Sequence, residues 1–435
     1  MSSGSRTHAG CLAIVACLAS VGCEPPPQVL RLDVTPGIES GDFVLDPAVT
    51  HFVIEARDHT GATVATNEAA PGSSFTLGQL PVTTLMTFEV TGRDSEQQVR
   101  VRGRSLAVLP SALNTDILPV FAQRLDRFSR PPDVLPEAMG NIRLIAAGSR
   151  HLMLVPVSTD GAPRAWFYDL LALSFTGPLA LPHAVRSVAT DPLGKVVLII
   201  GNEAASWVDF ALGTIEAATL PGGLGGWSSV AGGDTVQGPG RQYVVAGTRS
   251  GDPSDTVLVV GADRSLEVAR LRTARSGAAA AWLDGQGLVV AGGHATEAGV
   301  ELLRADVTEA SSLPFAADAT TGASLVPTAT PGRMILLGGQ DGNGPAATRE
   351  LAIDCLARCQ ANVVEPHIEV PITDSRAFQL SAGRVLLSGH DTQGLRQSFE
   401  VFIGDRVEAR PLREDRIGSD IAAGPNGSLF VAGGK

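Results

Sequence analysis

The chain has 435 residues, of which 44% are apolar, 18% charged and 5% aromatic, with 49 glycines and 28 prolines. The apolar fraction excludes a disordered chain, while this much glycine and proline predicts many turns. The formal net charge of −12 argues against a nucleic-acid partner, because a nucleic-acid-binding surface needs a basic face. A chain of this length suggests about three ordinary domains, or one large closed architecture with one small domain.

The first residues have the layout of an export signal. Arg6 supplies a positive charge, and residues 11–22 form an apolar or small run that is too short to cross a bilayer as a helix. The run ends at Cys23, which Glu24 and three prolines follow. This pattern resembles the lipobox of bacterial lipoproteins, which implies cleavage before Cys23 and attachment of lipid to its sulfur. The alternative is an ordinary signal peptide that is cut nearby and leaves Cys23 as a free thiol.

The lipobox resemblance implies an address in the cell envelope. Residues 1–22 would be the signal peptide and residues 23–28 a linker to the lipid anchor. The lipid would be the only membrane contact, because no later segment has the ~18 apolar residues that a span needs. Glu24 differs from the aspartate that commonly retains lipoproteins at the inner membrane, which favours the outer membrane. We expect a monomer whose partner is an unidentified protein or peptide.

Residues 29–112 show the two-residue alternation of half-buried strands, as in residues 29–34, 51–56, 87–90 and 98–101. Turns rich in glycine, proline and aspartate separate these strands. A stretch of short strands with no helical period predicts a small β-sandwich. The pattern resembles the immunoglobulin-like domains that are often placed between a lipid anchor and a working domain, and we expect it to act as a spacer.

From about residue 115 to residue 435, the chain repeats an apolar strand that ends in glycine. An earlier strand at His151–Val157 fits the same phase, which makes seven copies with a period near 45 residues. Self-similarity at this period is typical of propeller blades. A TIM barrel would need a helix in each unit, and no unit has the pattern of one. The glycines that end the other six strands are Gly201, Gly247, Gly292, Gly338, Gly389 and Gly433.

The clearest copy of the repeat runs from Arg275 to Asp306. An arginine precedes the innermost strand, Asp284-Gly285 forms a turn, and an apolar strand ending in two glycines follows. This order resembles the kelch repeat, and the resemblance implies that residues 115–435 form a seven-bladed kelch-like β-propeller. The predicted fold class is therefore all-β, with a small β-sandwich before the propeller. The four strands expected in this copy are residues 275–282, 288–293, 300–303 and 310–313.

The repeat also predicts how the ring closes. The last copy stops at Lys435 after its second strand, so it has no outer strands of its own. Residues 117–128 and 129–136 have the patterns of a third and a fourth strand. We expect them to pair with the C-terminal strands and to complete blade seven, which would leave only short, protected edges.

Cys355 and Cys359 remain after the signal peptide and the lipid site are set aside. They lie in the longest step of the repeat, between Gly338 and Gly389, and this predicts an inserted loop that a local disulfide pins. A metal site is the alternative, but it would need two more soft or imidazole ligands, and the nearest histidine in sequence is His367. We predict the disulfide and no metal.

In a propeller, the loops after the second strands and those before the innermost strands share one face around the channel. These loops carry charged and imidazole side chains here, and arginine is suited to carboxylate recognition. In kelch relatives this face often holds peptides, although the arginines could instead only brace neighbouring loops. The predicted ligand-binding residues are Glu203, Arg249, Arg275, His294, Asp341, Arg376, His390 and Asp391.

Two functions are consistent with these patterns. The first is a non-enzymatic, lipid-anchored binding or scaffolding protein of the cell envelope that uses the propeller loop face. The sequence favours it because no nucleophile elbow, zinc-protease helix or P-loop motif occurs. The alternative is an envelope enzyme that acts on a carbohydrate or small molecule at the channel mouth, near His294 and His390. We predict no catalytic residue and no cofactor.

Overall fold

The structure, a computed structural model, describes residues 28–73, 75–158, 163–222, 224, 227–229, 235–245, 247–293, 299–355, 359–365 and 369–434. The signal peptide predicted for residues 1–22 and the lipid site at Cys23 lie outside these residues. Within them, strands are the only regular elements apart from one 3-10 turn, η1 (Pro110–Ala112). No helix in the described part is long and apolar enough to cross a membrane.

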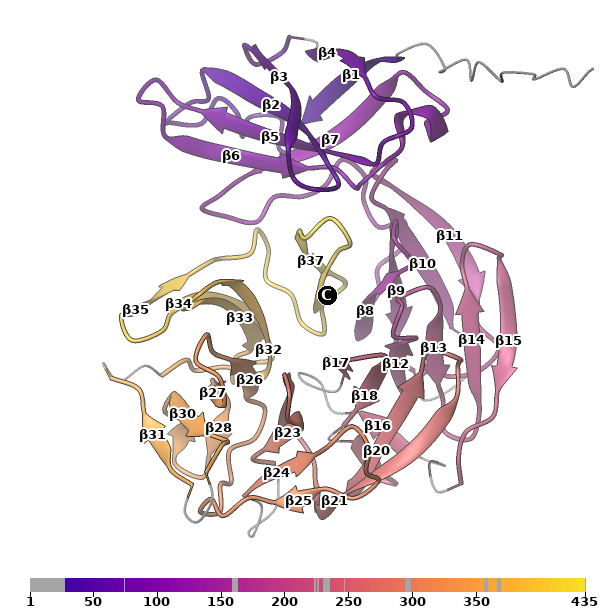
Figure 1. Cartoon of the computed structure of the whole chain (residues 1–435), viewed down its shortest axis with the longest axis vertical. Helices are drawn as coiled ribbons and strands as arrows, with labels where there is room; N and C mark the ends of the chain where they lie inside the picture. The colour runs from indigo at the N-terminus through magenta and orange to yellow at the C-terminus, as the bar shows by residue number, and fades with distance from the viewer. Residues whose placement is uncertain are drawn as a thin grey trace, which may run out of the picture.

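The N-terminal domain is one seven-stranded sheet that curls toward a barrel (Figure 1). Its strands alternate buried with half-buried residues, because one face covers the core and the other meets solvent. The ring of Phe52 lies in this core, 4.9 Å from the ring of Phe43 and 5.9 Å from that of Phe75. The strands are β1 (Gln28–Thr35), β2 (His51–Asp58), β3 (Thr63–Ala69), β4 (Phe75–Leu80), β5 (Met86–Arg93), β6 (Val99–Arg104) and β7 (Ile117–Arg124).

The sheet runs in the order β3-β2-β5-β6-β7-β1-β4, and its two ends approach each other. Asn67 Nδ2 on β3 donates a hydrogen bond to Thr76 O on β4 at 2.7 Å. Strand β1 pairs with β4 on one side and, in parallel, with β7 on the other. The two-sheet sandwich expected for residues 29–112 is therefore wrong, and the immunoglobulin-like arrangement is not confirmed. Alternation specifies which face of a strand is buried, but not which strand lies beside it.

Strand β7 belongs to the N-terminal sheet and not to the propeller, because it pairs with β1 and β6. Every second residue of β7 is buried, and Leu118, Val120 and Ala122 pack into the core of the N-terminal domain. Residues 129–136 form no strand. The expectation that residues 117–128 and 129–136 complete blade seven is therefore wrong.

The rest of the chain forms a ring of sheets around a central channel (Figure 1). Six blades have four or more strands, and the seventh copy forms only the two-stranded sheet β36–β37. The predicted β-propeller is confirmed, but the number of seven complete blades is wrong. Blade three is the largest, because the short strands β16 and β19 extend its sheet.

The strands of each blade follow in chain order from the channel outward. Blade one has β8 (Ile142–Ala147), β9 (His151–Pro156), β10 (Arg164–Asp169) and β11 (Ser174–Ala180). Blade two has β12 (Ser187–Thr190), β13 (Val197–Ile200), β14 (Ala205–Asp209) and β15 (Thr214–Ala218). Blade three has β17 (Thr235–Gly238), β18 (Arg241–Val244), β20 (Asp252–Gly261) and β21 (Leu266–Arg275), with β16 (Trp227–Ser229) and β19 (Gly247–Arg249).

Blade four has β22 (Ala279–Leu283), β23 (Gly287–Ala291), β24 (Val300–Leu303) and β25 (Ser311–Ser312). Blade five has β26 (Ser324–Pro327), β27 (Arg333–Leu337), β30 (Arg349–Ala352) and β31 (Ala361–Val363), with a small hairpin of β28 (Gln340–Asp341) and β29 (Gly344–Pro345). Blade six has β32 (Thr373–Ser381), β33 (Arg384–His390), β34 (Arg396–Phe402) and β35 (Arg406–Ala409). The incomplete blade seven has β36 (Asp420–Ala423) and β37 (Leu429–Ala432).

The repeated apolar strand takes the second place in each sheet. A second strand lies inside its blade and between neighbouring blades, so β13 and β23 are buried along their whole length. Burial on both faces explains why these strands read as continuous apolar runs. The strands concerned are β9, β13, β18, β23, β27, β33 and β37.

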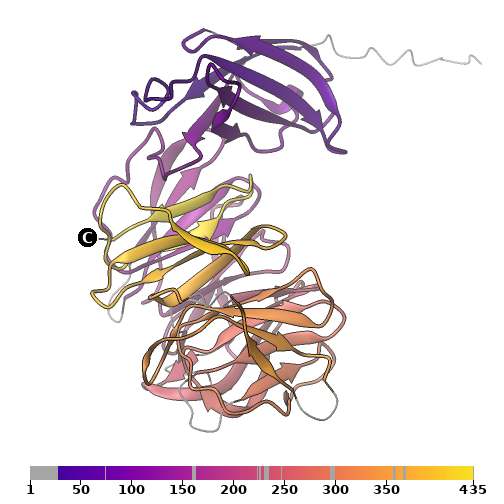
Figure 2. The same cartoon turned by 90° about the vertical axis from the view of Figure 1, so that its left-hand side faces the viewer.

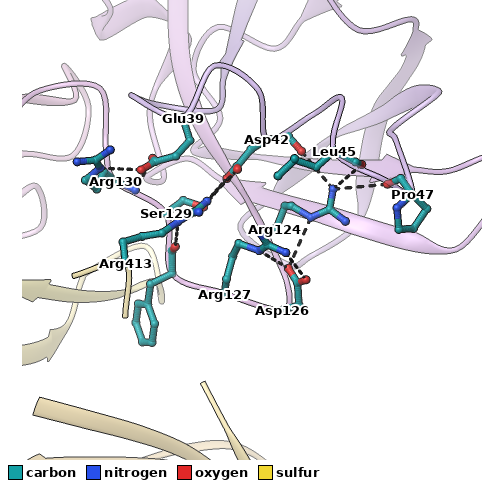
Figure 3. A network of polar contacts seen from close by, with 11 residues as sticks. Glu39, Asp42, Leu45, Pro47, Arg124, Asp126, Arg127, Ser129, Arg130 and Arg413 are labelled. Carbon is teal, nitrogen blue, oxygen red and sulfur yellow. Dashed lines mark hydrogen bonds and ion pairs between the residues drawn. The ribbon is translucent and has the colours of Figure 1, made fainter. Parts of the chain in front are cut away.

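The ring closes by packing of β36 against β8. Asp420 Oδ2 on β36 accepts a hydrogen bond from Leu144 N on β8 at 2.8 Å. The N-terminal domain lies at the rim beside blade seven (Figure 2). Arg413, from the connection between blades six and seven, donates through Nη2 to both carboxylate oxygens of the buried Asp42, at 2.9 and 3.2 Å (Figure 3). Its Nε donates to Phe128 O at 3.0 Å, so this contact holds the two domains together.

Candidate functional site

Three of the predicted binding residues lie on separate blades. Glu203 is exposed after the second strand of blade two, and Arg249 is exposed at the end of β19 in blade three. Asp341 is exposed in the β28–β29 hairpin of blade five, where its Oδ1 accepts a hydrogen bond from Asn343 N at 2.7 Å. His294 lies outside the described residues. These three described side chains therefore belong to different parts of the rim.

Arg275 is buried, and its side chain connects the loops of blade four through hydrogen bonds. Its side chain has no exposed surface, and its Nη1 donates to Gly292 O at 2.8 Å and to Gly299 O at 3.0 Å. Its Nη2 donates to Glu301 Oε1 at 2.5 Å. Burial lowers the pKa of Arg275, while Glu301 acts in the opposite direction. The prediction that Arg275 meets a ligand on the loop face is wrong, because the guanidinium does not reach solvent.

Arg416 repeats part of this arrangement in blade seven. Its Nη1 donates to Gly433 O at 2.8 Å, and Gly433 follows Arg416 by 17 residues, as Gly292 follows Arg275. Glycine is required at Gly292, because its φ is +67° and a Cβ there would lie 2.3 Å from Thr320 O. In these two blades the arginine braces the loop that the second strand enters.

The structure brings Arg376 and His390 together at the channel mouth between blades six and seven. We call Arg376, His390, Arg396 and Asp420 the channel-mouth cluster. Arg376 Nη1 lies 3.5 Å from Asp420 Oδ2 and donates to Ile421 O at 3.2 Å. These contacts connect the innermost strand of blade six to that of blade seven.

Arg396 is the buried centre of the channel-mouth cluster. Its Nη2 donates to Ser419 O at 2.6 Å and also lies 3.1 Å from His390 Nε2, which therefore accepts a hydrogen bond. Burial and the charge of Arg396 lower the pKa of His390 to about 4. Burial also lowers the pKa of Arg396 to about 10. Near pH 7 the imidazole is neutral, the guanidinium is charged, and Nε2 of His390 is occupied.

Asp391 shapes the loop next to this cluster. Its Oδ1 accepts hydrogen bonds from Gln393 N at 2.8 Å and from Leu395 N at 3.0 Å, and its Oδ2 accepts one from Gln397 Nε2 at 3.1 Å. Burial would raise the pKa of Asp391, but these hydrogen bonds outweigh it and lower the pKa. The carboxylate therefore holds its own turn.

Arg376 also faces a cavity of about 260 Å³ in the central channel. The innermost strands of several blades form its walls, and Arg376 is the only charged side chain among the described residues that line it. The Arg376 side chain is 21% exposed and lines this cavity, so part of it is accessible from the channel. One accessible cation in a largely uncharged cavity suits a small anionic group such as a carboxylate.

Cys355 and Cys359 are joined in a disulfide, with their Cα atoms 5.3 Å apart. The disulfide lies between β30 and β31 of blade five, in the inserted loop of the longest repeat step. Across the described residues, no three His, Cys, Asp or Glu side chains gather in a group that could hold a metal ion.

Sequence reasoning missed Arg396 and Asp420. Asp420 had a signal, because it is a single carboxylate directly before the apolar residues Ile421–Ala423. A carboxylate that enters a buried strand needs hydrogen-bond donors or a cation. There was no comparable indication for Arg396 in the sequence, since an arginine at the start of a third strand is expected to be exposed to solvent.

No protein-family model and no curated protein matches this chain. Three solved structures with 12% identity are similar in part. A chain of the crystal structure of the mitotic checkpoint complex has a TM-score of 0.45 and covers 70% of this chain and 86% of its own. Hydrazine synthase of Kuenenia stuttgartiensis has a TM-score of 0.43, with 69% and 97% covered. TolB from Acinetobacter baumannii has a TM-score of 0.37, with 75% and 78% covered. With TM-scores this low, the propeller assignment depends on the sheet order described above.

Proposed function

We propose that this protein is a non-enzymatic binding or scaffolding protein of the cell envelope, which binds a protein or peptide through the channel mouth of its propeller. The observation that carries the proposal is the partly exposed side chain of Arg376, the only charged one among the described residues that line the channel cavity. A planar guanidinium binds a carboxylate with two parallel hydrogen bonds. The ligand group that fits is therefore a carboxylate, from an acidic side chain or a peptide C-terminus.

The arrangement around Arg376 supports this proposal. Arg376 Nη1 keeps its contacts with Asp420 Oδ2 at 3.5 Å and Ile421 O at 3.2 Å, so a ligand carboxylate would meet the part of the side chain that faces the channel cavity. Asp420 is itself engaged by Leu144 N and Ile421 N, at 2.8 and 2.9 Å. The neighbouring Arg396 adds positive charge that favours an anion at the mouth.

The contacts of His390 disfavour the enzymatic alternative at this mouth. A general base near neutral pH needs a pKa close to the working pH and a free lone pair. His390 has a pKa of about 4, and its Nε2 already accepts a hydrogen bond from Arg396. We therefore assign His390 a positioning role, in which it holds the guanidinium of Arg396.

The proposal includes a lipid anchor on Cys23 and an outer-membrane address, with the N-terminal domain as the spacer. The support is the sequence pattern before Cys23 and the place of the N-terminal domain at the rim of the ring (Figure 2). A kelch-like origin of the blades is supported by the order of Arg275, Asp284-Gly285 and the double glycine at Gly292. Cys23→Ser should release the protein from membranes into the soluble fraction, and unchanged membrane retention would refute the anchor.

A pull-down from envelope extract tests the channel mouth. Arg376→Ala should lose the partner that the wild-type protein recovers, because it removes the accessible cation. Arg304→Ala is the matched control, since Arg304 is exposed on blade four and the substitution removes the same charge elsewhere. Equal recovery by Arg376→Ala and wild type would count against this site.

A further inference from the structure

Within the described part of the chain, blade seven lacks the third strand that pairs with the second strand in the complete blades. In the six complete blades, a third strand pairs with the repeated second strand. No strand among the described residues pairs with the outer side of β37. The residues of β37 are all half-buried, whereas those of β23 in blade four are all buried.

The register shows which backbone groups of β37 point outward. Gly424 N donates to Ser428 O at 2.8 Å, which makes these two residues a hydrogen-bonded pair at the turn. Hydrogen-bonded and non-hydrogen-bonded pairs alternate along antiparallel strands. The pairs of Leu429 with Ala423 and of Val431 with Ile421 are therefore non-hydrogen-bonded. The N–H and C=O groups of Leu429 and Val431 point away from β36, and an edge of this kind is a template for another strand.

On the side of blade one, a cavity of about 140 Å³ lies beside β37. Tyr168 on β10 and Phe175 on β11 line it together with Phe430. They occupy the outer half of blade one, which the outer strands of a complete blade seven would cover. Tyr168 is 3% exposed, and its buried hydroxyl has no hydrogen-bond partner among the described residues. A buried hydroxyl without a partner is costly, and this one lines a cavity in which a ligand could supply the partner.

On the side of blade six, a groove of about 760 Å³ lies between β37 and the N-terminal sheet. Seven arginines and three glutamates line it, although the whole chain has a net charge of −12. Arg102 on β6 is exposed, lines both the groove and the cavity, and forms no ion pair with a described acidic residue. Five of the seven arginines form ion pairs with acidic side chains, so the positive charge that attracts an acidic ligand comes from Arg93 and Arg102.

We infer that β37 accepts an extended segment of a partner protein, which adds to blade seven as its third strand and alternates acidic with apolar residues. Successive side chains of a strand point to opposite faces. An added strand would place one set of side chains in the cavity, near its apolar wall of Tyr168, Phe175 and Phe430, and the other set in the groove near Arg102. Its backbone would pair with Leu429 and Val431, as in other recognition by strand addition. This site is separate from the channel mouth and goes beyond the proposed function.

The two domains form this acceptor site together. Asn426 Nδ2, in the turn before β37, donates to Arg104 O of the N-terminal domain at 3.1 Å. The hydrogen bonds between Arg413 and Asp42, 13 residues before Asn426 on the propeller side, also hold the two domains together (Figure 3). The N-terminal domain therefore lies over β37 (Figures 1 and 2) and supplies one wall of the groove.

Fluorescence anisotropy with a labelled, amidated Glu-Val-Glu-Val-Glu-Val peptide tests the inference on the full chain. A Glu-Glu-Glu-Val-Val-Val peptide has the same composition but no alternation, and it should bind about tenfold more weakly. Arg102→Glu should weaken binding of the alternating peptide about tenfold, while Arg304→Glu should change it less than about twofold. Equal binding of both peptides, or of wild type and Arg102→Glu, would overturn the inference.

Hydrogen exchange distinguishes a peptide that pairs with β37 from one that is only held in the groove by charge. The alternating peptide should slow amide exchange in residues 429–432, because Val431 N–H and Leu429 N–H become hydrogen-bonded. Binding without protection of residues 429–432 would refute strand addition. Arg376→Ala should leave this protection unchanged, so the failure of the channel-mouth proposal and the failure of this one can be told apart.

Discussion

The substitution Arg275→Met tests whether a buried strut stabilises blade four. Methionine keeps an unbranched apolar stem and removes the guanidinium. Gly292 O and Gly299 O would lose their donor, and the carboxylate of Glu301, which is 2% exposed, would lose its counterion. The hydrogen bonds that Glu301 accepts from Arg272 N and Thr273 N, at 2.6 and 3.1 Å, would remain.

The magnitude follows from these contacts. Removing one partner of a buried ion pair costs about 3 to 5 kcal/mol of unfolding free energy. We therefore expect Arg275→Met to lower the unfolding free energy by about 3 to 5 kcal/mol at pH 7.

Urea unfolding followed by tryptophan fluorescence at pH 7 measures this loss. Arg270→Met is the matched control, because Arg270 forms an ion pair with Asp255 in which the side chains are 52% and 38% exposed. Such a surface pair contributes about 0 to 1 kcal/mol. The double variant Arg275→Met/Glu301→Gln should recover part of the loss, since no uncompensated charge remains. A loss for Arg275→Met no larger than that for Arg270→Met would show that the buried arginine does not stabilise blade four.

Three further predictions concern stability. The pKa of His390 is about 4 in the folded protein and that of an ordinary histidine is about 6.5, so the unfolded chain binds the proton first and stability falls as the pH drops from 6.5 to 4. His390→Asn should remove about 2 kcal/mol of the loss in unfolding free energy between pH 7 and pH 5, and an unchanged pH dependence would contradict this assignment. Arg413→Ala should cost about 1 to 3 kcal/mol and speed proteolysis of the linker at residues 125–141, because the buried Asp42 loses its cation, while Arg127→Ala should not. Tyr168→Phe should be neutral or raise the thermal midpoint, since it removes a hydroxyl without a partner, and a clear destabilisation would show that this hydroxyl is satisfied.

The repeat made the propeller predictable from the sequence. The strand order of the N-terminal domain was not predictable, because it depends on pairing between segments far apart in the chain. Strands such as β27 are buried on both faces, so their apolar runs and their spacing are visible in the sequence. The place of β7 was not visible, because its parallel pairing with β1 joins segments about 85 residues apart and leaves no local pattern. The same limit concealed the barrel-like closure of the N-terminal sheet.

The candidate site shows a similar division. Arg376 and His390 were predicted from their place in the repeat, but the ion pair of Arg376 with Asp420 and the hydrogen bond of Arg396 to Ser419 O depend on how blades six and seven meet. Arg275 was assigned to the loop face because it precedes an innermost strand of the repeat. The signal for its burial was Glu301, a single carboxylate inside the apolar strand Val300–Leu303, which needs a buried cation as its partner.

Isothermal titration calorimetry with one peptide in two forms can show whether Arg376 binds a carboxylate. A pentapeptide Ala-Gly-Ser-Val-Ala is titrated with a free C-terminal carboxylate and as the C-terminal amide. Carboxylate recognition by Arg376 predicts that the acid binds wild-type protein about tenfold more tightly than the amide, and that Arg376→Ala removes this difference while Arg304→Ala keeps it. Equal affinities of the two forms for wild type, or a difference that persists in Arg376→Ala, would contradict the claim that the channel mouth is the binding site.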